Sequence, residues 1–261
     1  MYPRSGLPTT GRQLPRWLAP ALGAGALIFS VAAIVDGLWI LGPTAEQGDY
    51  SKLIVVHPAV ATMAYVAFGV TALASLAYLW PRTRRREWDQ MAGASAEVGV
   101  VFSVLTLITG SIWGRPVWGV WWTWDARLTA TALLLALFLG YLALRRIPAE
   151  EVVRGRRCAV AALIAVLDVP VDHFATTWWQ TLHQGSSINV LQPTKHLDLS
   201  YNIGLLLGFV AMACAYGWLV IHRYRVEQLE ARYEREGLTL ALDARRAEGG
   251  LPAADRVGAS A

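Results

Sequence analysis

The sequence predicts an all-α polytopic membrane protein with six transmembrane helices, and three observations lead to this fold class. Hydrophobic residues make up 55% of the 261 positions and charged residues 16%, whereas about 25% of a typical soluble protein is charged. The apolar residues run without interruption over the roughly 20 positions that a helix needs to cross a bilayer. The basic residues gather in alternate connecting segments, which is the pattern of a chain that crosses a membrane repeatedly.

Six apolar segments account for the predicted spans. They are expected at residues 18–41, 53–79, 91–112, 126–144, 158–171 and 201–221. Asp36 lies within the first and Glu97 within the third. The fifth is the weakest, because Asp168 and Pro170 interrupt it. Without the fifth span, however, the arginine-rich tail would lie on the side opposite to the other basic segments, against the positive-inside rule.

The basic residues also predict how the chain is oriented. Of the 23 lysines and arginines, 19 lie before the first span, after the second, after the fourth or in the tail at 223–261, and only Lys52, Arg115, Arg127 and Lys195 lie on the other side. Both termini are therefore expected in the cytoplasm, with three loops outside. The mixed charges of residues 224–247 favour a cytoplasmic helix. The basic pI of about 9.3 follows from this topology, so we expect membrane lipid and no nucleic acid as a partner.

The second outer loop, residues 113–125, contains five of the twelve tryptophans, which are Trp113, Trp118, Trp121, Trp122 and Trp124. Tryptophans also form belts at membrane interfaces. A belt needs no glycine or proline, whereas Gly114, Pro116 and Gly119 are expected to bend this backbone so that several rings converge. Converging indoles suit a large planar aromatic ligand, and a porphyrin is such a ligand.

If the planar ligand is a porphyrin that carries iron, histidines on the same side are candidate axial ligands, because neutral imidazole is a common choice. His57 lies near the outer end of the second span, and His183 lies in the last outer loop, residues 172–200. A helix over residues 176–184 would place Trp179 and His183 on one face. His173 and His196 are reserve candidates. His222 lies at the cytoplasmic end of the last span.

Two motifs resemble the heme exporter protein C (CcmC) family of cytochrome c-type biogenesis. They are Trp-Gly-x-x-x-Trp-Gly-x-Trp-Trp-x-Trp-Asp at 113–125, which is similar to the family's WWD signature, and Trp-Trp-x-Thr-Leu-His-Gln-Gly at 178–185. The resemblance implies a six-span protein of the bacterial inner membrane with the WWD loop on its periplasmic face. It also implies non-covalent binding of heme b with His57 and His183 as the two axial ligands. One departure concerns His57, which Pro58 follows directly, whereas family members commonly have His-Val-Pro.

Three further side chains are candidates for contact with heme or for structural roles. Asp125 is placed either to cap the fourth span or to contact the ligand. Arg115 and Arg127 could neutralise heme propionates through bidentate pairing. Arg127 could instead pair with Asp125, Asp168 or Asp172.

The predicted function is heme transport rather than enzymatic catalysis. No Walker motif occurs, so other subunits would hydrolyse ATP. The resemblance implies the ATP-binding-cassette subunits CcmA and CcmB, the small membrane protein CcmD, and delivery of heme to the periplasmic chaperone CcmE. Two alternatives remain, which are a b-type membrane cytochrome that relays electrons and a permease for a non-heme aromatic substrate.

Overall fold

The computed structural model describes residues 15–183 and 198–248, and within these ranges the chain is almost entirely helical. Six helical segments are long and apolar enough to cross a membrane. These segments are Leu18–Ile40, Asp49–Leu79, Arg86–Trp118, Ala126–Arg146, Glu151–Trp178 and Leu199–Ala247. The predicted fold class, an all-α polytopic membrane protein, is therefore confirmed.

Seven α-helices and two short helical turns make up the described fold. In chain order they are α1 (Leu18–Val35), the π-helical turn η1 (Asp36–Ile40), the 3₁₀ turn η2 (Asp49–Val55), α2 (His57–Leu79), α3 (Arg86–Trp118), α4 (Ala126–Arg146), α5 (Glu151–Ala165), α6 (Asp168–Trp178) and α7 (Leu199–Glu248). The π-helical turn follows α1 directly, and α5 and α6 together form the fifth span.

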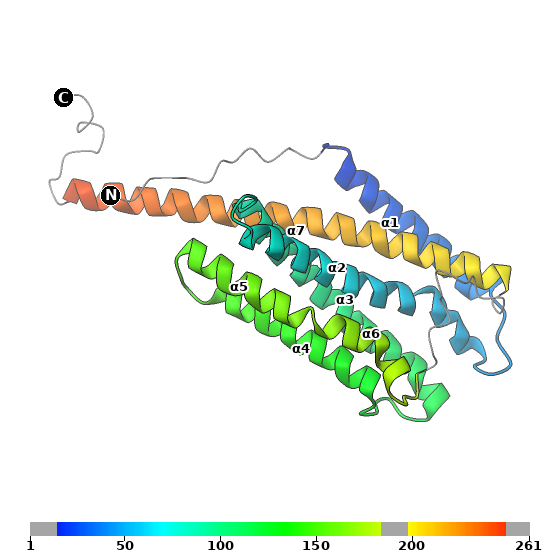
Figure 1. The fold of residues 1–261 in the computed structure, drawn as a ribbon. Helices are drawn as coiled ribbons and strands as arrows, with labels where there is room; N and C mark the ends of the chain where they lie inside the picture. The colour runs from blue at the N-terminus through cyan, green and yellow to red at the C-terminus, as the bar shows by residue number, and fades with distance from the viewer. Residues whose placement is uncertain (1–14, 184–197, 249–261) are drawn as a thin grey trace.

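The helices lie side by side in an elongated bundle (Figure 1). Helix α1 packs along α7, α2 along α3, and α4 against both α5 and α6. Helix α7 extends well beyond the other helices at its C-terminal end. The last span and the helix expected over residues 224–247 are thus one continuous helix.

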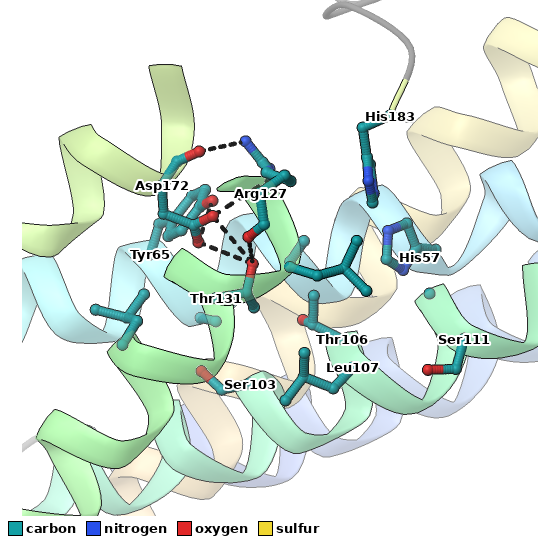
Figure 2. Close-up of a pocket in the computed structure, with 15 residues that line it drawn as sticks. His57, Tyr65, Ser103, Thr106, Leu107, Ser111, Arg127, Thr131, Asp172 and His183 are labelled. Atoms are coloured by element: carbon teal, nitrogen blue, oxygen red, sulfur yellow. Dashed lines mark hydrogen bonds and ion pairs between the residues drawn. The ribbon is translucent and has the colours of Figure 1, made fainter. Parts of the chain in front are cut away.

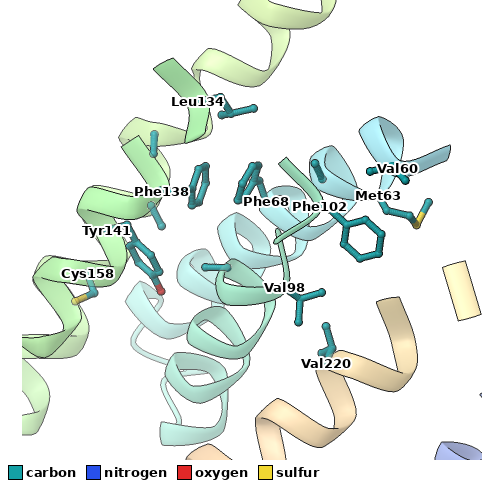
Figure 3. Packing of buried hydrophobic residues seen from close by; sticks show 14 residues of the cluster. Val60, Met63, Phe68, Val98, Phe102, Leu134, Phe138, Tyr141, Cys158 and Val220 are labelled. Carbon is teal, nitrogen blue, oxygen red and sulfur yellow. The ribbon is translucent and has the colours of Figure 1, made fainter. Parts of the chain in front are cut away.

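The core of the bundle lies between α2, α3, α4, α5 and α7 (Figure 3). Phe68 of α2 stacks on Phe138 of α4 with ring centroids 3.7 Å apart. Gly99 of α3 makes this possible, because a Cβ at that position would lie 2.6 Å from the Phe68 ring. Small residues at such contacts let membrane helices approach closely, where van der Waals packing holds them together.

The tryptophan-rich segment is more helical than predicted. Helix α3 continues through Gly114 and Pro116 to Trp118, so these two residues lie within a helix and not in a loop as expected. Only Gly119 turns the chain: its φ of +78° is the left-handed conformation that glycine adopts readily, and its N–H donates to the Arg115 carbonyl at 3.0 Å.

The fifth span also differs from expectation in two places. Its helix is interrupted at Val166 and Leu167, before Asp168, and Pro170 lies in the first turn of α6, where a missing N–H costs little. The helix predicted over residues 176–184 is wrong, because α6 ends at Trp178 and Trp179 is extended (φ −128°, ψ 158°).

Candidate functional site

The first element of the site is His57, which begins α2 beside the C-terminal half of α3. Pro58 lies in the first turn of this helix, where proline is well tolerated. His57 Nδ1 lies 2.9 Å from Thr109 Oγ1. The Thr109 hydroxyl donates its single proton to a backbone carbonyl, that of Leu105 at 2.7 Å. Its oxygen is therefore an acceptor for His57 Nδ1–H, which leaves the lone pair of the imidazole on Nε2.

The His57 ring is held in place by two further residues of α3. A Cβ on Gly110 would lie 3.1 Å from His57 Cε1, so the glycine makes room for the ring. Trp113 meets the ring edge-on, with centroids 5.7 Å apart and an interplanar angle of 88°. The Trp113 indole N–H donates to Gln47 Oε1 at 3.1 Å, which fixes the indole to the first interhelical loop.

The second element is His183, which follows α6 and reaches the site through contacts with α3 and α4. Its ring packs on Trp118, with centroids 4.8 Å apart. Trp118 itself lies over Gly114, where a Cβ would be 2.7 Å from the indole. Asp125 caps α4 by accepting from the Leu128 amide at 2.9 Å. Its other oxygen accepts from the Leu182 amide at 3.2 Å, so the backbone next to His183 is tied to this cap.

The environment of His183 keeps its imidazole neutral. Burial and, to a smaller extent, the positive charge of Arg127 lower its pKa to about 4, and the negative charge of Asp125 partly opposes this shift. His183 Nδ1 is buried and has no hydrogen-bond partner among the described residues. A neutral imidazole with an unused nitrogen is the form that binds metal ions.

The two histidines line one cavity of about 70 Å³, and Figure 2 shows the His183 ring directed toward that of His57. Ser103 and Thr106 of α3 line its deeper part. Ligand pockets that enclose a drug-sized molecule measure about 300–1,000 Å³. The cavity therefore has room for a few water molecules and for the edge of a ligand, but it does not enclose a porphyrin.

A buried polar network forms the other wall of the cavity (Figure 2). Asp172 is fully buried, and its carboxylate accepts from Tyr65 at 2.9 Å and from Thr131 at 3.0 Å. Arg127 Nε lies 3.5 Å from the same carboxylate, and its Nη1 donates to the backbone carbonyls of Asp172 and His173. Of the three partners that the sequence left open for Arg127, the structure selects Asp172.

Most of the other tryptophans in the two outer segments are exposed, and Trp122 is partly buried. Trp121 and Trp124 are 60% and 78% exposed. Trp122 meets Trp124 edge-on at 5.3 Å, and Trp178 and Trp179 are also exposed. Exposed apolar patches of this kind mark sites that contact a ligand, a partner or the membrane.

Several predicted residues lie elsewhere than expected. Trp179, which was expected beside His183, packs against Trp178 instead. The tryptophan that packs on His183 is Trp118. Arg115 is exposed and donates to the Gly119 carbonyl, so it closes the end of α3.

Neither His173 nor His222 lines the cavity. His173 is exposed and packs on Tyr65 and Phe174. Near the other end of the bundle, His222 Nδ1–H donates to the Trp218 carbonyl oxygen of its own helix at 2.8 Å. His196 lies outside the described residues.

Three residues that hold His57 in place were missed from the sequence: Gln47, Thr109 and Gly110. No motif includes them, and their roles depend on contacts with residues 52 to 66 positions away in the chain. A threonine and a glycine in an apolar span ordinarily serve helix packing. Only the pairing of α2 with α3 shows that they contact an imidazole.

The fold and the site define a class: a polytopic membrane protein with two histidines and a cluster of tryptophans gathered at one end of its bundle. Comparison with known proteins identifies the family. The family model described as CcmC, heme exporter protein C, matches residues 2–239. The chain belongs to this family.

Similar proteins cover most of the chain. The heme exporter protein C of Haemophilus influenzae is 32% identical over 228 residues, which are 87% of this chain and 92% of the relative. That of Bradyrhizobium diazoefficiens is 36% identical over 234 residues, or 88% and 84% of the two chains. That of Escherichia coli K12 is 31% identical over 199 residues, or 75% and 80%.

Proposed function

We propose that this protein binds heme b non-covalently at the tryptophan-rich end of its bundle, with His57 and His183 as axial ligands. The observation that carries the proposal is that two imidazoles from distant parts of the chain line one cavity and that each packs against an indole, that of Trp113 or Trp118. Iron takes two imidazole nitrogens without further protein ligands. The hydrogen bond of Thr109 leaves His57 Nε2 unprotonated and suited to this role.

The size of the cavity determines how heme would be held. Because about 70 Å³ does not enclose a porphyrin, the ring would lie across the mouth of the cavity and not inside it. Trp121 and Trp124 are exposed in the segment that joins α3 to α4 and would cover the apolar surface of the ring. Arg127 lines the cavity and supplies a positive charge for a propionate. An incompletely enclosed ring is suited to being passed on to another protein.

We further propose that the chain is a heme-handling subunit of an export system for cytochrome c biogenesis. The names of the similar proteins support this role. The tryptophan-rich end would face the periplasm and both termini the cytoplasm, with the protein in the inner membrane. The subunits CcmA, CcmB and CcmD would be its partners, and the periplasmic chaperone CcmE would receive the heme.

The axial ligands are tested by absorption spectroscopy. The wild-type protein purified from heme-replete cells is expected to show a low-spin bis-imidazole spectrum. His57→Ala and His183→Ala are each expected to lose this spectrum, and added imidazole is expected to restore it. His222→Ala is the matched control, because that histidine lies away from the site. A wild-type spectrum in both site variants would refute the assignment.

Delivery is tested against the two alternatives by adding CcmE. Heme-dependent co-purification of CcmE, followed by transfer of heme to it, is expected for a delivery protein. A b-type cytochrome would retain its heme throughout, and a permease for a non-heme substrate would be purified without heme. Retention of the heme would indicate a cytochrome, and purification without heme would indicate a permease. Either outcome would refute the proposed delivery of heme.

A further inference from the structure

A second and larger cavity of about 770 Å³ lies at the opposite end of the bundle, between α3, α4 and α7. His57 begins α2 at one end, whereas this cavity is formed by the start of α3, the end of α4 and the extension of α7. Its volume falls within the range of pockets that enclose small molecules. The heme proposal makes no use of it.

One wall of this cavity carries an excess of negative charge. Arg145 pairs with Asp89 at 2.8 Å and lies 3.9 Å from Glu227. The second cation, Arg223, pairs with Glu97 and Glu227 and lies 3.6 Å from Glu230. Four carboxylates thus share two guanidinium groups. Glu234, one turn beyond Glu230 on α7, adds another carboxylate to the lining.

The facing wall, where α4 is joined to α5, has the opposite imbalance. Arg146 and Arg154 line the cavity, and neither forms an ion pair with a carboxylate within residues 15–183 and 198–248. Arg154 Nε is buried and has no hydrogen-bond acceptor there. A buried donor without an acceptor costs about 1–3 kcal/mol, so this wall favours an anionic ligand that accepts from two guanidinium groups.

Apolar side chains complete the lining of the cavity. Val101 of α3 is one of them and is 52% exposed, and Leu142 of α4 is another. Val101 lies within a segment that is long and apolar enough to cross the membrane. An occupant that extends from the charged walls past Val101 would therefore enter the hydrocarbon region of the bilayer.

From this arrangement we propose that the cavity binds a phospholipid with a primary-amine headgroup, phosphatidylethanolamine. Its phosphate would accept from Arg146 and Arg154, since guanidinium groups match phosphate oxygens. Its ammonium group would donate to Glu230 and Glu234, and its acyl chains would lie along Val101. An anionic headgroup without an amine would leave the carboxylates of α7 unneutralised. A choline headgroup has no N–H with which to donate to them.

The lipid is identified by native mass spectrometry of the intact protein, incubated with equal amounts of phosphatidylethanolamine, phosphatidylglycerol and phosphatidylcholine of the same chain length. Preferential retention of phosphatidylethanolamine is expected. The double substitution Arg146→Gln/Arg154→Gln is expected to reduce this retention about tenfold. Arg225→Gln/Arg232→Gln removes the same charge from exposed positions of α7 outside the lining and serves as the matched control.

A second double variant tests the ammonium subsite. Glu230→Gln/Glu234→Gln is expected to abolish the preference for phosphatidylethanolamine over phosphatidylglycerol while retaining the phosphate contact. Equal retention of the three lipids, or arginine variants that behave as the control does, would refute a phospholipid site. A preference for phosphatidylglycerol that the glutamate variant leaves unchanged would refute the amine and indicate a site for anionic lipid. Heme content and circular dichroism, expected to match the wild type, verify that each variant is folded.

Discussion

Thr109 provides the sharpest test of how His57 is prepared to bind iron. The substitution Thr109→Val keeps the shape of the side chain and removes the oxygen that accepts from His57 Nδ1–H at 2.9 Å. The imidazole then has a buried donor without a partner, and nothing fixes which nitrogen carries the proton. We therefore expect weaker heme binding, although His57 is still present as the axial ligand.

Two estimates of the effect agree. Leaving a buried donor unpaired costs about 1–3 kcal/mol. Loss of an outer-shell partner of a ligating histidine typically lowers metal affinity about 10–100-fold, which corresponds to roughly 1.4–2.8 kcal/mol. Heme affinity of the Thr109→Val variant is therefore expected to fall by one to two orders of magnitude.

The assay is a titration of the heme-depleted protein with heme, followed by the absorption of the low-spin complex. Thr106→Val is the matched control, because Thr106 lies one turn earlier on α3, also lines the cavity and donates to the Phe102 carbonyl at 2.8 Å. Like Thr109→Val, the Thr106→Val variant loses a hydrogen bond from a threonine hydroxyl to a backbone carbonyl, but it loses no contact with His57. Equal affinities for the two variants would refute the role assigned to Thr109.

Three other predictions concern His183, its support and the buried network. Since burial and the nearby charge of Arg127 lower the pKa of His183 from 6.5 to about 4, the unfolded chain binds more protons between these values, and stability is expected to fall as the pH drops through this window. Low-spin heme should persist to about pH 5 and be lost near pH 4; a spectroscopic midpoint at 6.5 would contradict this. Gly114→Ala places a Cβ 2.7 Å from Trp118, whereas a Cβ on Gly140 has no neighbour within 4 Å. The first substitution is expected to lower heme occupancy and Gly140→Ala to leave it unchanged, and equal occupancies would show that Trp118 does not support the site. Asp172→Asn is expected to destabilise the protein by about 3–5 kcal/mol in thermal unfolding, because it leaves the guanidinium of Arg127, whose side chain is only 20% exposed, without its charge partner; a change below 1 kcal/mol would show that the ion pair is dispensable.

The sequence was most informative where a pattern depends on local chemistry. Continuous apolar runs fix the number of spans, because a bilayer requires about 20 apolar residues whatever the tertiary structure. Asp125 was expected as a helix cap, and its carboxylate does accept from the Leu128 amide. Capping involves residues three positions apart, so a short stretch of sequence contains all of the information.

Predictions failed where a backbone segment has competing partners. The helix expected over residues 176–184 ends at Trp178, because the Leu182 amide donates to Asp125, a residue 57 positions earlier. Glycine and proline likewise did not interrupt α3, since Gly114 provides room for Trp118 and the helix continues past Pro116.

By itself, the sequence determined that this protein is a six-span membrane protein with a tryptophan-rich segment and a small set of candidate histidines. These properties follow from composition and short-range pattern. The tertiary structure decided which residues surround each histidine: Thr109 and Trp113 beside His57, and Trp118 beside His183. It also decided that Arg127 pairs with Asp172. Such contacts join helices far apart in the chain, and the packing of those helices depends on the whole bundle.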